Sequence, residues 1–460
     1  MIYVVAKAAL VIKENLIARR KHMKPKQLKK LLMSKIQNVA NNSNLYCTNP
    51  EKDFTRKRKL TMEKMIVGII GMESGSLTNE LIDFFNTSAG TPTSSAFCQQ
   101  RCKISSDAFQ TIFCQFSQEI LDSFKDDLPL LAVDGSKIQI PTNPEDTDSF
   151  FPGANGQKPY NLLHLNALYN LKHSIYDDVI IQKSKYSNEH KAFTEMVDRS
   201  RLPKALVIAD RGYESYNNMA HVQEKGWFFL IRVKDGETGI KEAFDLPKEP
   251  EYDMPISLNL IRRQNKETKI LFKDRNYYRF VPTTSTFDYL PLKSKKADPI
   301  ISYNLRFRIV RFKISENTYE TILTNLDAFQ YPSDRLKELY AVRWGIETSF
   351  RDLKYTIGML DFHSKKVMCI QQEIYAHLIM YNFTEMITSH VVIDQKQRKY
   401  TYKANFSVAA HMCRLFYRGR ATSPDLETII ARNLVPIRPD RHRERKLSGK
   451  IFHGFLYRVA

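Results

Sequence analysis

The spacing of apolar residues changes along the chain and separates regions of different predicted structure. Between residues 24 and 125, apolar residues recur at three- and four-residue intervals, which is typical of amphipathic helices. From residue 129 onward, short apolar runs such as LLAV at 130–133 and LVIA at 206–209 predict buried strands. Over residues 129–233 the pattern predicts three strands followed by helix, strand, helix and strand.

The alternation of helix and strand stops after this segment. Residues 236–326 contain the strand-like runs MPISLNLIRR, KILFKDRNYYRFVP, YNLRFRIVRFKI and YETILTNL, separated by polar turns. A Pro-Ser-Asp start signal at 332–334 then predicts one long helix, DRLKELYAVRWGIETSFRDLKYTIG. A second long amphipathic helix is expected over about residues 370–392.

These patterns predict an α/β multidomain chain. Its centre is expected to be a ribonuclease-H-like mixed sheet core interrupted by a β-rich insertion, with a helical N-terminal domain and a helical C-terminal region. The expected parts are a basic helical DNA-binding region at 1–125, the first core part at 126–235, the insertion at 236–326, the second core part at 327–395 and a basic helical region at 396–460.

Positive charge is concentrated at the two ends of the chain. The 460 residues carry a formal charge of +20; residues 1–60 hold fifteen Lys and Arg against three acids, and residues 431–460 hold eight against two. Such a field attracts polyanions, so nucleic acid is the first partner to consider, although basic ends are also common as solubilising tails. A short helix carrying Gln99, Gln100, Arg101 and Lys103 could enter a DNA groove or simply pack as an ordinary helix.

The cysteines and the apolar segments indicate where the protein works. Six cysteines without a CxxC pair favour neither a disulfide framework nor a zinc site, and a reducing cytoplasm, at the bacterial nucleoid, is expected. The apolar start MIYVVAKAALVI is too short for a signal sequence and lacks a cleavage site. No stretch reaches the roughly 18 apolar residues of a membrane span. We also consider that translation begins at Met23.

Two aspartates follow the apolar runs of predicted buried strands. Asp134 comes directly after LLAV and Asp210 directly after LVIA. A carboxylate leaving a buried sheet edge needs a compensating partner, and an oxygen-binding cation such as Mg²⁺ is a natural one. The strings DGS and DRGY are, however, also ordinary turn signals.

The predicted helix from residue 334 adds a polar stripe. At 100° per residue, its side chains Tyr340, Arg343, Glu347 and Lys354 fall within a sector about 60° wide. The apolar side chains Val342, Ile346 and Leu353 fall on the opposite side. An ordinary surface helix, with Glu347 paired to Arg351, would show the same pattern.

These residues resemble the DDE transposases of the insertion-sequence-four family. The pattern Y-AV-R-WGI-E-TSFRDL-K, from Tyr340 to Lys354, keeps every spacing of the family signature, and DGS at 134–136, DRGY at 210–213 and TNL at 324–326 also match. The resemblance covers roughly residues 60–390. It implies metal-dependent cleavage at the ends of a mobile element and strand transfer into target DNA. Members of the family can free the element through a hairpin at its end.

The resemblance also implies roles for particular residues. Asp134, Asp210 and Glu347 would be the catalytic residues and the ligands of two Mg²⁺ or Mn²⁺ ions. The side chains of Tyr340, Arg343 and Lys354 would contact DNA near the cleaved end. The expected partners are the terminal inverted repeats and the target DNA, bound by a homodimer whose interface uses the C-terminal helices, and no membrane is expected.

The hairpin step needs an aromatic ring to stack on a flipped base. In relatives a Trp of the β insertion supplies it, but the two Trp here are Trp227 and Trp344, both outside the insertion. Other aromatic residues of the insertion could substitute or could be core residues: Tyr277, Tyr278, Phe280, Phe287 and Tyr289. The strand bearing Arg306, Arg308 and Arg311 either touches DNA or presents a solvated face. The rival functions are a catalytically inactive, transposase-derived DNA-binding protein and a plain hydrolytic nuclease.

Overall fold

The computed structural model describes residues 23–437, apart from residues 57, 125, 154–155, 157, 234–238, 294–298, 317 and 394–399. The apolar start that precedes the alternative initiation site Met23 lies outside the described residues, as does most of the basic C-terminal tail. None of the helices in the described ranges is both long enough and apolar enough to cross a membrane.

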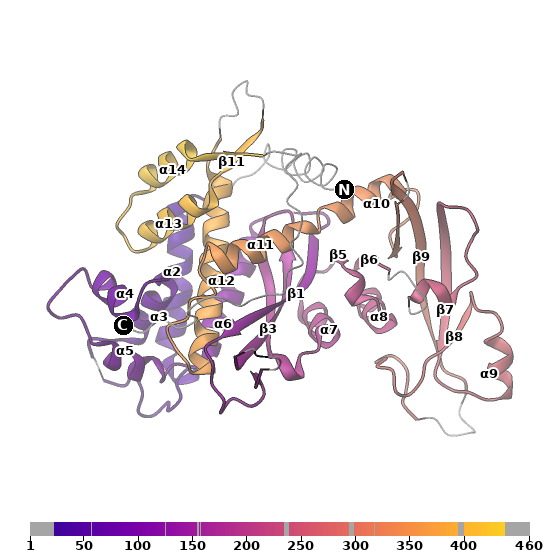
Figure 1. The fold of residues 1–460 in the computed structure, drawn as a ribbon, viewed down its shortest axis with the longest axis horizontal. Coiled ribbons are helices and arrows are strands. Elements are labelled where there is room, and N and C mark those ends of the chain that lie inside the picture. The colour runs from indigo at the N-terminus through magenta and orange to yellow at the C-terminus, as the bar shows by residue number, and fades with distance from the viewer. Residues whose placement is uncertain are drawn as a thin grey trace.

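A large mixed sheet forms the centre of the molecule (Figure 1). Its first strands are β1 (Leu130–Ile140), β2 (Phe150–Phe151), β3 (Tyr160–Asn170), β4 (Ile175–Lys183), β5 (Leu206–Ala209) and β6 (Phe228–Arg232). Strands β1, β5 and β6 are parallel neighbours, whereas β3 runs antiparallel to both β1 and β4. Helix α7 (Glu189–Arg199) precedes β5, and α8 (Tyr216–Glu224) joins β5 to β6. The predicted order of strands and helices over 129–233 is confirmed, except that the two-residue strand β2 adds a fourth strand before α7.

Alternate residues of the central strands enter different hydrophobic cores. In β5, Val207 and Ala209 lie in the core that includes α7 and α8, whereas Leu206 and Ile208 lie in a second core on the other face. Successive side chains of a strand point to opposite faces, so a strand apolar at every position must be covered on both sides. This explains why β5 is a continuous apolar run.

Residues 252–324 continue the same sheet. They form β7 (Tyr252–Ile261), β8 (Tyr278–Phe280), β9 (Ser302–Ser315) and β10 (Thr318–Thr324), and β10 pairs antiparallel with β6. The predicted strand KILFKDRNYYRFVP is wrong in its first part, because residues Lys266–Leu271 form helix α9. A capping box starts this helix: the Asn265 side chain accepts from the Thr268 amide at 2.8 Å, and the Thr268 hydroxyl accepts from the Asn265 amide at 2.8 Å.

The TNL string at 324–326 fastens β10 to β6. The Thr324 hydroxyl donates to the Phe229 carbonyl at 2.7 Å, and the Asn325 side-chain oxygen accepts from the Phe229 amide at 2.8 Å. The Asn325 amide group donates to the Trp227 carbonyl at 3.0 Å. These side chains extend the ladder beyond the last backbone pair, so this string joins the two halves of the sheet.

Segments from both ends of the chain form a helical layer on one side of the sheet (Figure 1). Its helices are α2 (Pro25–Asn41), α3 (Met62–Gly71), α4 (Leu77–Phe84), α5 (Ser94–Arg101), α6 (Ser106–Asp122), α12 (Val367–His390), α13 (Phe406–Tyr417) and α14 (Ser423–Arg432). A small two-stranded sheet, β11 (Tyr402–Ala404) with β12 (Leu434–Pro436), lies beside α13 and α14. One hydrophobic core contains residues from Leu28 to Ile120 together with residues from Ile346 to Ile430.

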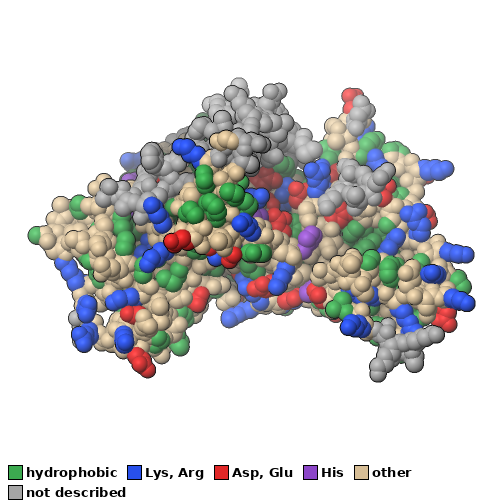
Figure 2. All heavy atoms as spheres, turned by 60° about the horizontal axis from the view of Figure 1, so that its bottom comes forward, with side chains coloured by type: hydrophobic (Ala, Val, Ile, Leu, Met, Phe, Trp, Pro, Cys, Tyr) green, Lys and Arg blue, Asp and Glu red, His purple; other side chains and the backbone are tan. Residues whose placement is uncertain are grey.

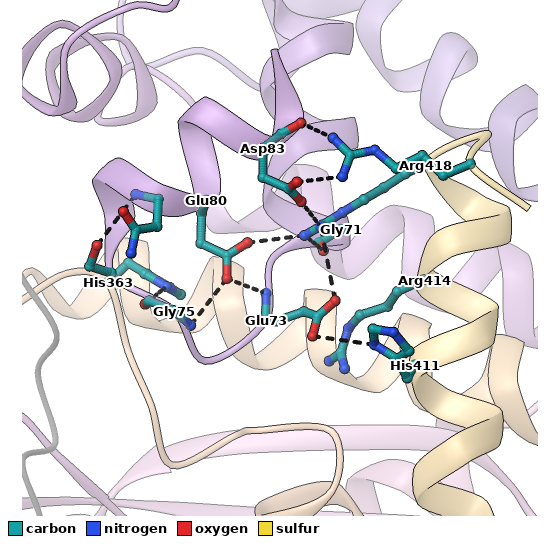
Figure 3. Close-up of polar contacts among 12 residues, drawn as sticks. Gly71, Glu73, Gly75, Glu80, Asp83, His363, His411, Arg414 and Arg418 are labelled. Carbon is teal, nitrogen blue, oxygen red and sulfur yellow. Dashed lines mark hydrogen bonds and ion pairs between the residues drawn. The ribbon is translucent and has the colours of Figure 1, made fainter. Parts of the chain in front are cut away.

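A polar network ties the start of this layer to its end (Figure 3). The Glu80 carboxylate accepts from the amides of Glu73 and Gly75 at 3.1 Å each and pairs with Arg418 of the loop after α13 at 3.0 Å. Arg418 also pairs with Asp83 at the end of α4. Both Glu80 and Arg418 are largely buried, so the contact belongs to the packed interior of the layer.

Two arginines considered for DNA binding instead form ion pairs inside the protein. Arg101, at the end of α5, is 1% exposed and pairs with Glu373 of α12 at 2.8 Å. Arg308 of β9 is buried, pairs with Asp253 of β7 and donates to the Leu326 carbonyl at 2.9 Å. Both side chains are therefore unavailable to a DNA groove. For Arg308, both predicted alternatives, contact with DNA and exposure to solvent, are wrong.

Candidate active site

Asp134 and Asp210 lie at the same level of two neighbouring parallel strands. Asp210 directly follows the end of β5 as predicted, but Asp134 lies inside β1, which continues to Ile140 in its pairing with β3. Val133 of β1 is the register partner of Ala209 of β5, and each aspartate is the next residue along its strand. The Asp134 carboxylate accepts from the Gly135 amide at 2.8 Å, and the Asp210 carboxylate accepts from the Arg211 amide at 2.7 Å. The two carboxylates are therefore held side by side, and each is oriented by the backbone amide of the residue that follows it.

The environment of Asp134 disfavours its charge. Burial raises the pKa of Asp134 to about 6, and the neighbouring carboxylates of Glu347 and Asp210 contribute in the same direction. The Gly135 amide and the Arg343 guanidinium act against them. A positive charge bound next to this carboxyl group would therefore stabilise its ionised form.

The glutamate lies on the second of two helices, since the single long helix predicted from residue 334 is interrupted. Helix α10 (Ser333–Ala341) ends before Val342, and α11 (Trp344–Tyr355) begins after Arg343. Around the break the amides of Arg343 and Gly345 bond three residues back, to the carbonyls of Tyr340 and Val342. The break occurs because the two helices pack on different cores.

The polar stripe lies beside the strands that carry the aspartates. Tyr340 is buried, and its hydroxyl lies 3.5 Å from an oxygen of Asp210. Arg343 is 3% exposed and donates to Glu347 at 3.0 Å. Lys354 lies farther along α11 and donates to the carbonyl of Lys137 in β1 at 2.8 Å.

Arg343 is the positive counterpart of the acidic residues in this structure. Burial would lower its pKa, but Tyr340 and the carboxylates of Asp210, Glu347 and Asp134 outweigh that effect and raise it. Its guanidinium also lies over the ring of Trp344, 5.3 Å from the centroid. The positive charge of Arg343 therefore interacts with every ionisable group of this cluster.

Three further polar residues near the aspartates were not singled out from the sequence. His164 of β3 is buried and pairs with Glu189 at the start of α7 at 3.1 Å. A Cβ atom on Gly135 would lie 2.5 Å from Nε2 of His164, so the glycine of DGS makes room for that imidazole. The hydroxyl of Tyr213, from DRGY, is buried without a hydrogen-bond partner among the described residues. A lone His in an apolar strand carries no signal, but Tyr213 stood in a quoted motif.

The donor set suits a hard divalent cation, because carboxylate oxygens are its preferred ligands. Burial is the main cause of the raised pKa of Asp134, so a bound cation would favour the charged form of this carboxylate. In the arrangement described, no three His, Cys, Asp or Glu side chains stand close enough together to enclose an ion. The pairing of Glu347 with Arg343 accounts for part of this, because it directs one carboxylate to the guanidinium.

The aromatic residues considered for base stacking differ in exposure. Phe287 is a core residue, and Tyr289 packs against the same core. Tyr277 is 56% exposed, whereas Tyr278 and Phe280 are half-buried. Trp227 is buried and donates to the Leu202 carbonyl at 2.9 Å, so it has a structural role.

The fold and the site define a class, a mixed α/β protein with acidic side chains at the same level of two neighbouring parallel strands. Comparison identifies the family: residues 125–383 match the family model described as "Transposase DDE domain", and the chain belongs to that family. Similar curated proteins are the transposase InsG of insertion sequence IS4 from Escherichia coli, 22% identical over 71% of this chain and 70% of its own, and the IS231F transposase of Bacillus thuringiensis subsp. israelensis, 22% identical over 75% of each. The cryo-EM structure of a piggyBac transposase synaptic complex with hairpin DNA aligns with 90% of this chain and 85% of its own, at 11% identity and a TM-score of 0.43.

Proposed function

We propose that this DDE transposase cuts the DNA strands at the ends of its element and joins them to target DNA, with Asp134, Asp210 and Glu347 as the ligands of two Mg²⁺ or Mn²⁺ ions. The observation that carries the proposal is the register of β1 and β5, which sets Asp134 and Asp210 side by side. The influence of Glu347 on the pKa of Asp134 supports placing all three carboxylates in one site.

The ions would activate the attacking oxygen and stabilise the leaving oxygen of the phosphodiester. The protein's own part is to hold the carboxylates: backbone amides orient the two aspartates, and α11 presents Glu347. Tyr340 supports Asp210 through its hydroxyl. We propose that Arg343 changes its partner. It pairs with Glu347 in the structure described, and it would bind a DNA phosphate once cations neutralise the Glu347 carboxylate.

The topology supports a more specific fold assignment. The order β4-β3-β1-β5-β6, with parallel β1, β5 and β6, supports our proposal of a ribonuclease-H-like core. We propose that residues 126–235 and 327–395 form this core and that residues 236–326 are an insertion that extends its sheet. The regions 1–125 and 396–460 remain our proposed flanking regions, although their helices share one hydrophobic core.

The DNA partners follow from the family, and we propose the terminal inverted repeats and a target duplex as substrates of a homodimer. If end cleavage proceeds through a hairpin, Tyr277 is our candidate for stacking on the flipped base, because it is the most exposed of the insertion aromatics considered. The remaining positive side chain of the signature, Lys354, would contact the phosphate backbone as a point charge.

The test is an assay with purified full-length protein, a labelled duplex carrying the element's own end, and a target plasmid. We expect cleavage and joining with Mg²⁺ or Mn²⁺ and none with excess EDTA. Asp134→Asn and Glu347→Gln should retain DNA binding and lose cleavage, because the amide removes the charge that holds a cation. Glu338→Gln is the matched control, since Glu338 is an exposed carboxylate on α10 paired with Arg335.

Each result separates the competing functions. Binding of DNA without cleavage in any divalent metal would identify a non-catalytic DNA-binding descendant. Cleavage without joining would identify a hydrolytic nuclease. Cleavage retained by Glu347→Gln would remove Glu347 from the set of ligands.

A further inference from the structure

A basic hollow lies at the far end of the helical layer, away from the acidic site. It encloses about 200 Å³ between residues of 51–56, with Arg58, and the end of α5. In Figure 2, Lys and Arg side chains gather at this end of the molecule, which carries α4 and α5 in Figure 1. The lining residues are Glu51, Lys52, Phe54, Thr55, Arg56, Arg58, Gln100 and Lys103.

The hollow has a strong excess of positive charge. Four of its lining side chains are cationic and only Glu51 is acidic. The other acid of the segment, Asp53, is turned inward: it is 6% exposed, accepts from the Asn49 amide at 3.0 Å and lies 3.7 Å from Lys103. Lys52, Arg56 and Arg58 are exposed to solvent. An anion that enters the hollow therefore meets several cations and little competing negative charge.

The segment that precedes the hollow is held firmly against the end of α5. Cys47 forms a β-bridge with Ile104, and the Thr48 amide donates to the Lys103 carbonyl at 2.9 Å. The opposite wall is fixed by Gln100, whose side chain donates to the Leu60 carbonyl at 3.4 Å. Phe54 adopts a left-handed backbone with φ of 56°, a conformation that costs energy in a residue other than glycine. The backbone on both sides of the hollow is thus held by tertiary contacts.

We propose that this hollow binds the phosphate backbone of duplex DNA, with Arg56 and Arg58 as its principal contacts. The inference rests on the proposed function, which supplies DNA as the partner, and adds a contact site remote from the acidic residues. Guanidinium groups suit phosphate because they donate two hydrogen bonds at once. Backbone contacts of this kind position a duplex without reading its sequence.

The test compares two variants that each lower the net charge by two. Arg56→Gln/Arg58→Gln removes cations from the hollow and leaves Lys103 in place, because Asp53 needs its partner. Arg201→Gln/Lys204→Gln is the matched control, in the exposed loop between α7 and β5, at the other end of β5 from Asp210. Binding of the full chain to a labelled end duplex and to an unrelated duplex is measured from about 0.05 to 0.3 M salt.

We expect the hollow variant to bind both duplexes roughly 10- to 100-fold more weakly at about 0.1 M salt, with a slope of log K against log salt smaller by about 2. The control variant should keep the wild-type slope. DNA should also protect Lys52 and Lys103 of the wild-type chain from acetylation, read by mass spectrometry.

The outcomes distinguish the two proposals. A hollow variant with wild-type slope and affinity, or unprotected lysines in the DNA complex, would overturn the hollow as a contact site while leaving the transposase proposal intact. A wild-type chain that binds neither duplex would overturn the proposed function itself, and the hollow with it.

Discussion

Glu373→Gln should destabilise the helical layer strongly and in a pH-dependent way. Glu373 is 2% exposed, pairs with Arg101 at 2.8 Å and accepts from the His363 amide at 2.9 Å. Burial by itself would raise the pKa of Glu373, but Arg101 and His363 outweigh it and lower that pKa from 4.5 to about 2. The gap corresponds to a contribution of roughly 3 kcal/mol near neutral pH, comparable with the cost of breaking a buried ion pair.

The pH window follows from the direction of each shift. The contribution of Glu373, whose folded pKa is depressed, is present above its unfolded pKa and is lost as the pH falls toward 2. That of His363, whose folded pKa is raised above 6.5, is complete below 6.5 and is lost as the pH rises through the folded value. We therefore expect Glu373→Gln to cost roughly 3 kcal/mol at about pH 6 and about half as much near pH 3.

Urea unfolding followed by circular dichroism, with hydrogen exchange of the α12 amides as a local readout, measures this cost. Glu195→Gln is the matched control, because Glu195 pairs with Arg199 at 3.0 Å but is 50% exposed, and exposed pairs contribute about 0–1 kcal/mol. A cost no larger than that of the control, or a cost unchanged between the two pH values, would refute the electrostatic account of this pair.

Three further changes test the site and the sheet. Gly135→Ala should lower the melting temperature and abolish cleavage, because its Cβ would lie 2.5 Å from His164 Nε2; a variant with wild-type melting would show that the imidazole can move. Tyr213→Phe should fold at least as stably as the wild type in thermal melts, because the hydroxyl is buried without a partner among the described residues, and a loss of stability would reveal a hidden hydrogen bond. Asn325→Ala should cost about 2–4 kcal/mol in urea unfolding by removing two bonds to β6, and a cost below about 1 kcal/mol would rule out the fastening role of this side chain.

The strands that carry the aspartates could be predicted because burial leaves a direct trace in sequence. A strand covered on both faces must be apolar throughout, so LLAV and LVIA mark the buried parts of β1 and β5. The first polar residue marks the end of the strand in β5 but not in β1, which continues to Ile140. The sequence pattern could not predict that β1 and β5 are neighbours, because strand order depends on contacts between distant segments. The predicted α/β class is confirmed.

The helix break and the buried ion pairs could not be predicted from the sequence pattern. Helical spacing continues through residue 343, but Leu336 and Leu339 pack on the core beside β5 and β9, whereas Ile346 and Leu353 pack on the core of the helical layer. Tertiary packing thus overrides a continuous local pattern. Arg101 looked like a surface cation because its partner Glu373 lies far along the chain.

The contact between Glu80 and Arg418 joins residues 338 positions apart, and this separation constrains how the protein is made. At about 5–20 residues per second, the ribosome needs roughly 17–70 s after Glu80 to supply its partner. For most of that interval α3 and α4 lack α12 and α13, which complete the hydrophobic core around them. These early helices are therefore among the last to reach their native environment, and a chain released early would expose their apolar faces to chaperones and proteases.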